Sequence, residues 1–385
     1  MSSSRKAYIG AEIFDGTTRH RDRALIVEGG RVSALLPERA PVPGVVVERL
    51  SGGLICPGFV DLQVNGGGGV MLNDEPSVDT LRRMAVAHAR LGATSIMPTL
   101  ITDTPDKTVA AIDAVEAAIA AGVPGILGLH LEGPHLSVSR KGAHDGGMIR
   151  AMTGADLEVL LDAAQRLPVL KLTISPESVS TDQIASLTRA GVLVSLGHSD
   201  ASYAACDQAA AAGARCVTHL FNAMSQLTGR EPGLVGAALA QGGLSAGLIA
   251  DGHHVHPETI RLAMRAKAGP GQIFLVSDAM AVAGTDMSAF ELGGRRILRR
   301  DGRLTLEDGT LAGADLDLLT AMRNLTRWGI ADVDTALAMA TSIPASLIGA
   351  AQGVGTLAPG APADFLLIDP SGQAPAKVWQ AGHPV

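Results

Sequence analysis

The sequence predicts an α/β fold in which eight parallel strands close into a (β/α)8 barrel, with a small β-sandwich domain built from both chain ends. Short β-rich apolar runs alternate eight times with Ala- and Leu-rich stretches of helical period, and this alternation favours a parallel sheet with right-handed crossovers. Only 3% of the 385 residues are aromatic, which suits a barrel because Val, Ile and Leu fill most barrel interiors. These observations together indicate a TIM-type barrel.

The expected barrel elements follow one another along the chain. Strands are predicted at residues 58–64, 94–99, 126–131, 169–174, 192–196, 215–219, 244–250 and 273–277. Helices between them are predicted at, among others, residues 77–91, 105–121, 155–166, 202–212 and 257–267. The uncharged run 233–250 is about long enough to raise the question of a membrane span, but its five glycines, Gln241 and Ser245 favour a helix, a turn and a strand.

The two ends of the chain have the pattern of short strands and turns. Turn signals such as Asp15-Gly16 punctuate residues 1–52 and 353–385. We expect these two segments to pair into the small β domain, with residues 53–352 forming the barrel. A further hairpin is expected within residues 291–308, because Asp301-Gly302 is a typical hairpin turn.

An open, doubly wound parallel sheet is the alternative arrangement. It needs a glycine-rich phosphate turn after its first strand, and the run Asn65-Gly66-Gly67-Gly68-Gly69 superficially supplies one. No obvious acidic ribose partner follows about 20 residues later, and no Walker lysine follows, so the run is weak evidence for a nucleotide site. We therefore favour the closed barrel.

Charge and composition limit the classes of partner. The formal net charge is −7 and the ten aromatic rings are scattered, so no nucleic-acid partner is expected. No membrane partner is expected either, and no secretory leader is visible at the start of the sequence. The three cysteines, Cys56, Cys206 and Cys216, form no CxxC pair, and their odd number argues against a disulfide framework. We expect a reducing, cytoplasmic location.

Polar residues gather at the carboxyl ends of the predicted strands, where the active sites of barrels lie. Glu132 ends the third strand, His198 follows the fifth, His219 ends the sixth and Asp278 follows the eighth. One such residue is usually structural, but one carboxylate and two imidazoles form the ligand set of a catalytic divalent metal. We expect one divalent ion per subunit, zinc in the first place, although Fe, Mn and Co accept the same ligands. Asp278 is expected to act as general base and acid, or else to orient a histidine.

Strand alternation predicts which neighbouring side chains share the barrel interior. If His198 faces inward, Leu196 does too. If His219 faces inward, Val217 does too and Cys216 faces outward. Cys216 is therefore expected to pack against the core and not to bind metal.

Six motifs occur in order over nearly the whole chain. They are Pro57-Gly58-Phe59-Val60-Asp61, His130-Leu131-Glu132-Gly133-Pro134, Gly197-His198-Ser199, Thr218-His219-Leu220-Phe221-Asn222-Ala223-Met224, Gly229-Arg230-Glu231-Pro232-Gly233 and Asp251-Gly252-His253-His254-Val255. The set resembles the N-acetylglucosamine-6-phosphate deacetylases of the amidohydrolase superfamily. This resemblance implies hydrolysis of the acetamide of N-acetylglucosamine 6-phosphate to glucosamine 6-phosphate and acetate, in amino-sugar catabolism or recycling.

The chain departs from the superfamily pattern at the end of the first strand. A His-x-His pair is usual there, whereas this chain has Gln63-Val64-Asn65. Neutral amides are poor zinc ligands, so one metal position should be weakened or lost. The substitution is characteristic of the deacetylase branch, and it favours a single-metal site over dihydroorotase-like or urease-like relatives.

Carried over residue by residue, the resemblance assigns roles to the site. Glu132, His198 and His219 would hold the metal, Asp278 would be the general base and acid, and His144 would polarise the acetamide carbonyl. Arg230 would reach into a neighbouring subunit, which implies a homodimer. The implied substrate-binding residues are Ala143, His144, Asn222, Ala223, Arg230, Asp251, His254, Leu311, Ala312 and Gly313.

Two other functions stay open on the sequence. One is another metal-dependent amidohydrolase that acts on a different N-acyl sugar or on an N-acyl amino acid. It would share the metal residues but would need no residues that bind a phosphate. A non-catalytic sugar-phosphate sensor would keep Arg230 and His254 but would have no reason to bury the metal residues and Asp278 together. Because aromatic rings are scarce, a sugar has to be held by charge and metal.

Overall fold

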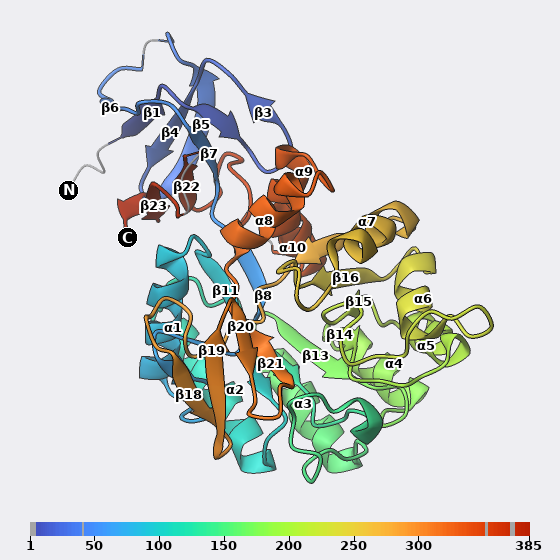
Figure 1. Ribbon diagram of the computed structural model, residues 1–385. Helices are drawn as coiled ribbons and strands as arrows, with labels where there is room; N and C mark the ends of the chain where they lie inside the picture. The colour runs from blue at the N-terminus through green and yellow to red at the C-terminus, as the bar shows by residue number, and fades with distance from the viewer. Residues whose placement is uncertain (1–4, 41, 351–352, 370–373) are drawn as a thin grey trace.

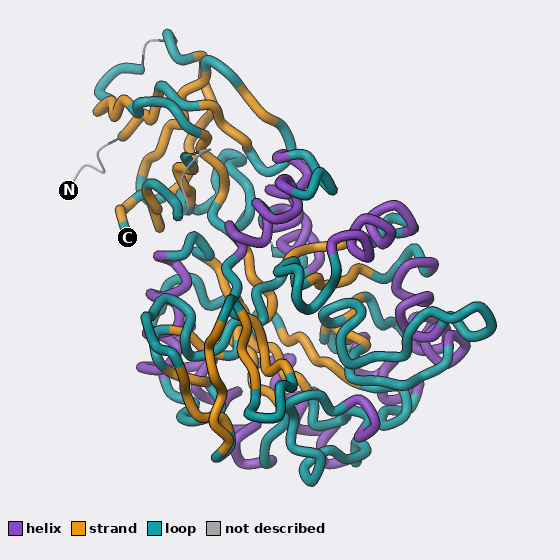
Figure 2. Tube along the Cα trace, in the orientation of Figure 1, coloured by secondary structure: helices purple, strands orange, loops and turns teal. Residues whose placement is uncertain are grey.

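The computed structural model describes residues 5–40, 42–350, 353–369 and 374–385. Figure 1 shows a barrel surrounded by helices and a smaller all-β unit that carries the first and the last strands. In Figure 2 the helices of the barrel part lie around its strands. The predicted α/β fold is confirmed.

The barrel sheet has eight parallel strands in chain order. They are β8 (Val60–Val64), β11 (Ser95–Ile101), β12 (Leu129–Glu132), β13 (Leu170–Ile174), β14 (Leu193–Leu196), β15 (Cys216–Val217), β16 (Ser245–Leu248) and β17 (Ile273–Leu275). The ring closes just after β17, where Asp278 N–H donates to Gln63 O at 3.1 Å and Asn65 N–H donates to Ala279 O at 2.9 Å. All eight predicted strands are present, and the closed arrangement is confirmed over the open sheet.

Helices connect successive strands and cover the outside of the barrel. They are α1 (Val78–Arg90), α2 (Pro105–Ala120), α3 (Gly154–Arg166), α4 (Thr181–Arg189), α5 (Tyr203–Ala211), α6 (Gly233–Ala240), α7 (Pro257–Ala266), α8 (Leu318–Arg327), α9 (Val333–Ala340) and α10 (Ser342–Leu347). Capping boxes at Thr153 and Ser180 begin α3 and α4. The run 233–250 folds as α6, a turn and β16, as predicted. Within the described ranges no helix combines the length and apolar content needed to cross a membrane.

Two sheets make up the all-β unit. One has the order β5-β4-β1-β6 and the other β24-β23-β22-β7-β2-β3. A single hydrophobic cluster takes side chains from both sheets, including Tyr8, Phe365 and Trp379, whose ring centroids lie 4.6 to 5.3 Å apart. A sandwich built from both chain ends is therefore present, while the exact division at residues 52 and 352 stays a prediction. The strands are β1 (Lys6–Ile9), β2 (Glu12–Phe14), β3 (Arg19–His20), β4 (Arg23–Glu28), β5 (Arg31–Pro37), β6 (Val46–Arg49), β7 (Leu54–Pro57), β22 (Phe365–Ile368), β23 (Lys377–Gln380) and β24 (His383–Pro384).

A separate four-stranded sheet, which we call the mouth sheet, lies over the barrel opening. Its strands pair in the order β18 (Ala289–Leu292), β19 (Arg295–Arg300), β20 (Arg303–Thr305) and β21 (Leu311–Ala314). The predicted Asp301-Gly302 turn joins β19 to β20, with both residues at positive φ. Arg295 donates to Ala143 O at 2.5 Å, and Arg303 donates to His253 Nδ1 at 3.1 Å. The mouth sheet therefore contacts two loops that carry predicted site residues. A small ribbon of β9 (Gly66–Gly67) and β10 (Val70–Met71) follows β8.

Candidate active site

A cavity of about 250 Å³ lies at the carboxyl ends of the barrel strands. It brings together most of the residues that the sequence singled out. The predicted residues in its lining are Glu132, Ala143, His144, His198, His219, Asn222, Ala223, His254, Asp278, Leu311 and Gly313. The lining also contains residues that had no predicted binding role: Asn65, Ile101, Gly142, Ile249, Met280, Leu292 and Thr310.

Three ligand-type atoms converge at the floor of this cavity. Nε2 of His198 and Nε2 of His219 lie 3.0 Å apart, and they lie 3.3 and 3.0 Å from Oε1 of Glu132. His198 donates from Nδ1 to Arg140 O at 2.9 Å, which turns its Nε2 toward the other two ligand atoms. Burial alone would raise the pKa of Glu132, but the two imidazoles facing it hold that pKa well below its usual range. Two nitrogens and a carboxylate oxygen that share one point fit a divalent metal.

Buried charges inside the barrel also fit a bound cation. The carboxylates of Asp61, Glu132 and Asp278 are buried there with one lysine, Lys171. Lys171 Nζ reaches across the interior and donates to Leu62 O at 3.3 Å. The carboxylates outnumber the lysine even when Asp61, whose pKa burial raises to about 7, is counted as protonated. Because uncompensated buried charge is costly, a cation bound beside Glu132 and Asp278 would stabilise this interior.

The backbone leaves regular strand geometry where the site begins. His198, His219 and Asp278 have φ values of 47°, 26° and 52°, in the left-handed region that non-glycine residues rarely adopt. Each turns its side chain by a local backbone change, so the alternation of the preceding strand no longer predicts its direction.

This geometry overturns one expectation about β14 and β15. Burial raises the pKa of the Cys216 thiol, and the ammonium group of Lys171, inside the barrel, opposes that rise. Cys216 pairs in register with Ser195 and faces the interior with it, whereas Val217 faces the helices. The predicted outward direction of Cys216 was wrong, because His219 turns toward the cavity through its left-handed φ. All three cysteines are free and buried.

Asp278 faces the metal-ligand atoms from the end of the eighth strand. Its Oδ1 accepts hydrogen bonds from Asn65 Nδ2 at 2.8 Å and from Gln63 Nε2 at 3.1 Å. Burial, and then the charge of Glu132, raise the pKa of the Asp278 carboxyl. A carboxylate whose affinity for a proton is raised is suited to take a proton and to give it back.

His144 enters the cavity from the loop after β12. Thr102 donates its backbone N–H to His144 Nδ1 at 3.3 Å, and its hydroxyl lies 2.8 Å from the same nitrogen. Nδ1 is therefore an acceptor, and the proton of the neutral ring sits on Nε2. Burial, together with the neighbouring His198, lowers the pKa of His144 to about 3. The ring is a neutral hydrogen-bond donor near pH 7.

Comparison with known proteins identifies the family. The profile of the Amidohydrolase family matches residues 54–384.

The chain belongs to the amidohydrolase family.

The chain is 43% identical over 335 residues to the N-acetylgalactosamine-6-phosphate deacetylase of Shewanella sp. (strain ANA-3), covering 87% of this chain and 84% of that protein. It is 33% identical over 356 residues to the N-acetylglucosamine-6-phosphate deacetylase of Haemophilus influenzae, covering 92% of each. The crystal structure of the N-acetylglucosamine-6-phosphate deacetylase from Pasteurella multocida superposes with a TM-score of 0.93 at 33% identity, covering 99% of each chain. The predicted family is confirmed.

Amidohydrolases are metal-dependent hydrolases, and this chain has one clear place for the metal. In the part of the chain that the structure describes, Glu132, His198 and His219 form the one group of three or more metal-ligating side chains whose ligand atoms all lie within 4.8 Å of one another. The departure at Gln63-Val64-Asn65 is consistent with this single site, because the amide groups of Gln63 and Asn65 donate to carboxylates.

Asp251 lies outside the cavity lining but contacts a residue within it. Its Oδ2 accepts a hydrogen bond from His254 Nδ1 at 2.6 Å, and its Oδ1 accepts the backbone N–H groups of His253 and His254 at 2.8 Å. Asp251 therefore fixes the direction in which the His254 ring points. His256 instead caps α7 through the backbone N–H of Glu258.

Two other predicted residues lie away from the lining. Ala312 is buried in a small hydrophobic cluster with Met280 and Leu292, and it is not in the cavity lining that contains Leu311 and Gly313. Arg230 is exposed on the loop that projects beside α5 and α6 (Figure 1). Glu231 does not pair with it, since Glu231 Oε1 accepts the backbone N–H groups of Tyr203 and Gly233. The structure shows no ion pair or hydrogen bond for Arg230 with any described residue of its own chain.

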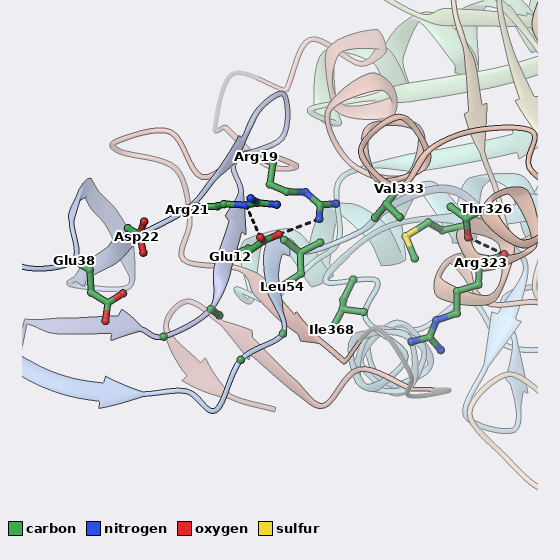
Figure 3. Close-up of a pocket in the computed structure, with 15 residues that line it drawn as sticks. Glu12, Arg19, Arg21, Asp22, Glu38, Leu54, Arg323, Thr326, Val333 and Ile368 are labelled. Carbon is green, nitrogen blue, oxygen red and sulfur yellow. Dashed lines mark hydrogen bonds and ion pairs between the residues drawn. The ribbon is translucent and has the colours of Figure 1, made fainter.

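A larger cavity, of about 640 Å³, lies between the all-β unit and helices α8 and α9. Figure 3 shows Arg19 and Arg21 turned toward Glu12. Glu12 pairs with Arg19 at 3.1 Å and with Arg21 at 2.8 Å, and Arg19 also pairs with Asp334 of α9 at 2.6 Å. The ion pair between Arg19 and Asp334 links the all-β unit to the barrel part. No group of metal-ligating side chains meets there within the described residues, so the smaller cavity is the candidate active site.

Proposed function

We propose that this amidohydrolase hydrolyses the acetamide of N-acetylglucosamine 6-phosphate to glucosamine 6-phosphate and acetate, in amino-sugar catabolism or recycling. One observation carries the proposal. Three metal ligands, a carboxylate of raised proton affinity and a neutral imidazole face one cavity of about 250 Å³. This is the set of groups that amide hydrolysis needs to activate water, move a proton and polarise a carbonyl. The name of the Haemophilus influenzae relative supports the same substrate.

The galacto epimer, N-acetylgalactosamine 6-phosphate, is a second candidate substrate. The Shewanella relative, at 43% identity, is named for that epimer, and the Haemophilus influenzae relative, at 33%, is named for the gluco epimer. The two sugars differ in the orientation of the hydroxyl group at C4, so the same metal residues and Asp278 would serve both. Measuring kcat/KM for the two epimers under the same conditions decides which one is preferred.

In the proposed mechanism the residues of this chain divide the chemistry. Glu132, His198 and His219 hold one divalent ion, zinc in the first place with Fe, Mn or Co also accepted, and the ion supplies Lewis acidity at the reacting carbonyl. Asp278 takes a proton from the attacking water and then delivers it to the amide nitrogen, so that the amine can leave. His144 donates its Nε2–H to the carbonyl oxygen, where negative charge develops.

Binding of the phosphate and the sugar is also part of the proposal. No lysine or arginine belongs to the described lining of the cavity, which offers imidazole and backbone groups instead. We therefore propose a homodimer in which Arg230 of a second copy meets the phosphate, since this residue forms no ion pair or hydrogen bond with the described residues of its own chain. The proposed contacts on the sugar side come from Ala143, Asn222, Ala223, His254, Leu311 and Gly313, with Asp251 and Ala312 supporting them from behind.

Acetate release by metal-analysed protein tests this function. We expect release from the 6-phosphate substrate, loss of activity on chelation and recovery when zinc is added back. Asp278→Asn should abolish turnover while one metal per chain remains. Equal cleavage of unphosphorylated N-acetylglucosamine or of an N-acyl amino acid would point to another amidohydrolase activity. The cytoplasmic location is proposed with this function, and cell fractionation tests it.

A further inference from the structure

Two buried amide side chains lie between a metal ligand and the carboxylate that moves the proton. We propose that Gln63 and Asn65, which we call the amide clamp, position Asp278 by holding its Oδ1 so that its Oδ2 is left for the proton. Both are then positioning residues that act through Asp278. The inference rests on the proposed function, because the direction of Asp278 matters to the rate only if this carboxylate transfers the proton.

The contacts of the clamp are short and come from one short segment. Gln63 lies in β8 and Asn65 directly follows the strand, two positions later, and both side chains point toward Asp278. Asn65 Nδ2 donates to Asp278 Oδ1 at 2.8 Å, and Gln63 Nε2 donates to the same oxygen at 3.1 Å. Gln63 Nε2 also lies 3.1 and 3.2 Å from the two carboxylate oxygens of Glu132. One amide nitrogen therefore contacts both carboxylates.

The chemistry of the partners fixes which way the amides point. Ionised carboxylates only accept hydrogen bonds, so the NH₂ groups must face Glu132 and Asp278 and the amide oxygens must face away. Those oxygens, Gln63 Oε1 and Asn65 Oδ1, are buried and have no hydrogen-bond partner among the described residues. A buried acceptor without a partner is destabilising. The chain thus gives up stability to keep these two donors on the carboxylates, as expected where orientation serves the reaction.

The clamp makes the two oxygens of Asp278 unequal. Both amide hydrogen bonds end on Oδ1, while the carboxyl group lines the cavity. The backbone adds to this restraint, because Asp278 N–H donates to Gln63 O at 3.1 Å and Ala314 N–H donates to Asp278 O at 2.9 Å. A carboxylate held at one oxygen and along its backbone presents the other oxygen in a constant direction, which is the condition for efficient proton transfer.

The two amides differ in one contact, and this difference separates their effects. Among the described residues, the Asn65 side chain hydrogen-bonds to Asp278 alone, whereas the Gln63 side chain also hydrogen-bonds to the metal ligand Glu132. Removing the Asn65 donors should therefore slow the reaction without loosening the metal. Removing the Gln63 donors should slow the reaction and weaken metal binding together.

The test compares Asn65→Leu and Gln63→Met with a matched control, Gln241→Met. Gln241 also donates its amide to a carboxylate, that of Asp207, but it lies beside α5 and α6 on the outside of the barrel. We expect Asn65→Leu to lower kcat by about 100-fold, with KM within about threefold of wild type and one metal per chain by elemental analysis. Gln63→Met should lower kcat similarly and need more zinc for half-occupancy, whereas Gln241→Met should keep the wild-type kcat.

Thermal unfolding and circular dichroism accompany each variant to show that it is folded. If Asn65→Leu does not fold, Asn65→Asp, which keeps the shape and replaces the donor by an acceptor, takes its place with the same expected loss of kcat. A folded Asn65 variant with kcat within twofold of wild type, or one that loses metal as Gln63→Met does, overturns the proposal. Failure of the proposed function is a different result, since wild-type protein itself would then release no acetate.

Discussion

Replacing Arg230 with alanine tests how this amidohydrolase holds a phosphate group. The described lining of the cavity contains no lysine or arginine. Arg230 is exposed on a loop, and it forms no ion pair or hydrogen bond with any residue that the structure describes. Arg230→Ala should therefore leave the melting temperature of the isolated chain nearly unchanged, because no polar contact among these residues is lost, and should act on substrate binding.

The size of the effect follows from the charges that meet. A hydrogen bond to a charged group contributes about 1.5 to 3 kcal/mol, and each 1.36 kcal/mol corresponds to a factor of ten. We expect KM for the 6-phosphate substrate to rise by about 10- to 150-fold. The kcat should stay within about threefold, because Arg230 contacts none of the proton-transfer or metal residues. With unphosphorylated N-acetylglucosamine as substrate, wild type and variant should have the same KM.

Mixed dimers show which chain supplies the arginine. When Arg230→Ala and Asp278→Asn proteins are dissociated and reassociated together, one cavity of each mixed dimer combines an intact Asp278 with an intact Arg230 from the other chain. At substrate concentrations well below the KM of Arg230→Ala, activity should then exceed that of either variant alone. The reasoning would be refuted by mixed dimers without recovered activity, or by an Arg230→Ala protein with wild-type KM for the phosphorylated substrate.

Three further predictions address the chemistry and the fold. His144→Ala should lower kcat by about 10²- to 10³-fold, as loss of one oxyanion donor does, with metal content unchanged; a loss under tenfold would contradict the donor role. Burial raises the pKa of Asp61 to about 7, so the folded chain binds this proton more tightly than the unfolded chain, and wild-type stability should fall as pH rises from about 4 to 7. In urea unfolding of metal-free protein, the free energy of unfolding of Asp61→Asn should rise relative to that of wild type by up to about 4 kcal/mol over this pH range. A difference between the two free energies that does not change with pH would argue against the raised pKa. Trp379, stacked on Phe365 at 4.6 Å and 1% exposed, should lose about 3 to 5 kcal/mol of stability on replacement by alanine; urea unfolding measures this, and a loss below about 1 kcal/mol would contradict the packing argument.

The barrel is predictable from the sequence because each of its elements carries its own local signal. Glu132, His198, His219 and Asp278 all lie at or just after the end of a short apolar run. Because functional residues of barrels lie at the carboxyl ends of the strands, this position identifies them as candidates. The direction of each side chain is less predictable. Left-handed φ values at His198, His219 and Asp278 have no signature in residue type, since they arise from the packing of the loops that follow the strands.

The mouth sheet shows which cavity residues the sequence can predict and which it cannot. Leu292 and Thr310 reach the cavity only because this sheet folds over the barrel, and a hairpin pattern predicts pairing but not placement. Within β21, by contrast, Leu311 and Gly313 belong to the cavity lining and Ala312 does not. The period of two in a strand predicts this division of the three residues.

Closure of the barrel and completion of the active site depend on the same backbone hydrogen bonds, those between the end of β8 and the residues that follow β17. Glu132, His198 and His219 follow from β12, β14 and β15, which lie close together within the sheet, so an open sheet would still bring the metal ligands together. Asp278 comes 213 and 215 residues after the amides that hold it, and the three meet only where the last strand returns to the first. The hydrogen bond from Asp278 N–H to Gln63 O, at 3.1 Å, is part of that closure. A change that loosens these hydrogen bonds should therefore leave a protein that binds metal but transfers protons poorly. The metal ligands follow strands β12, β14 and β15 within the sheet, whereas Asp278 and the amides that hold it come from the two ends of the sheet.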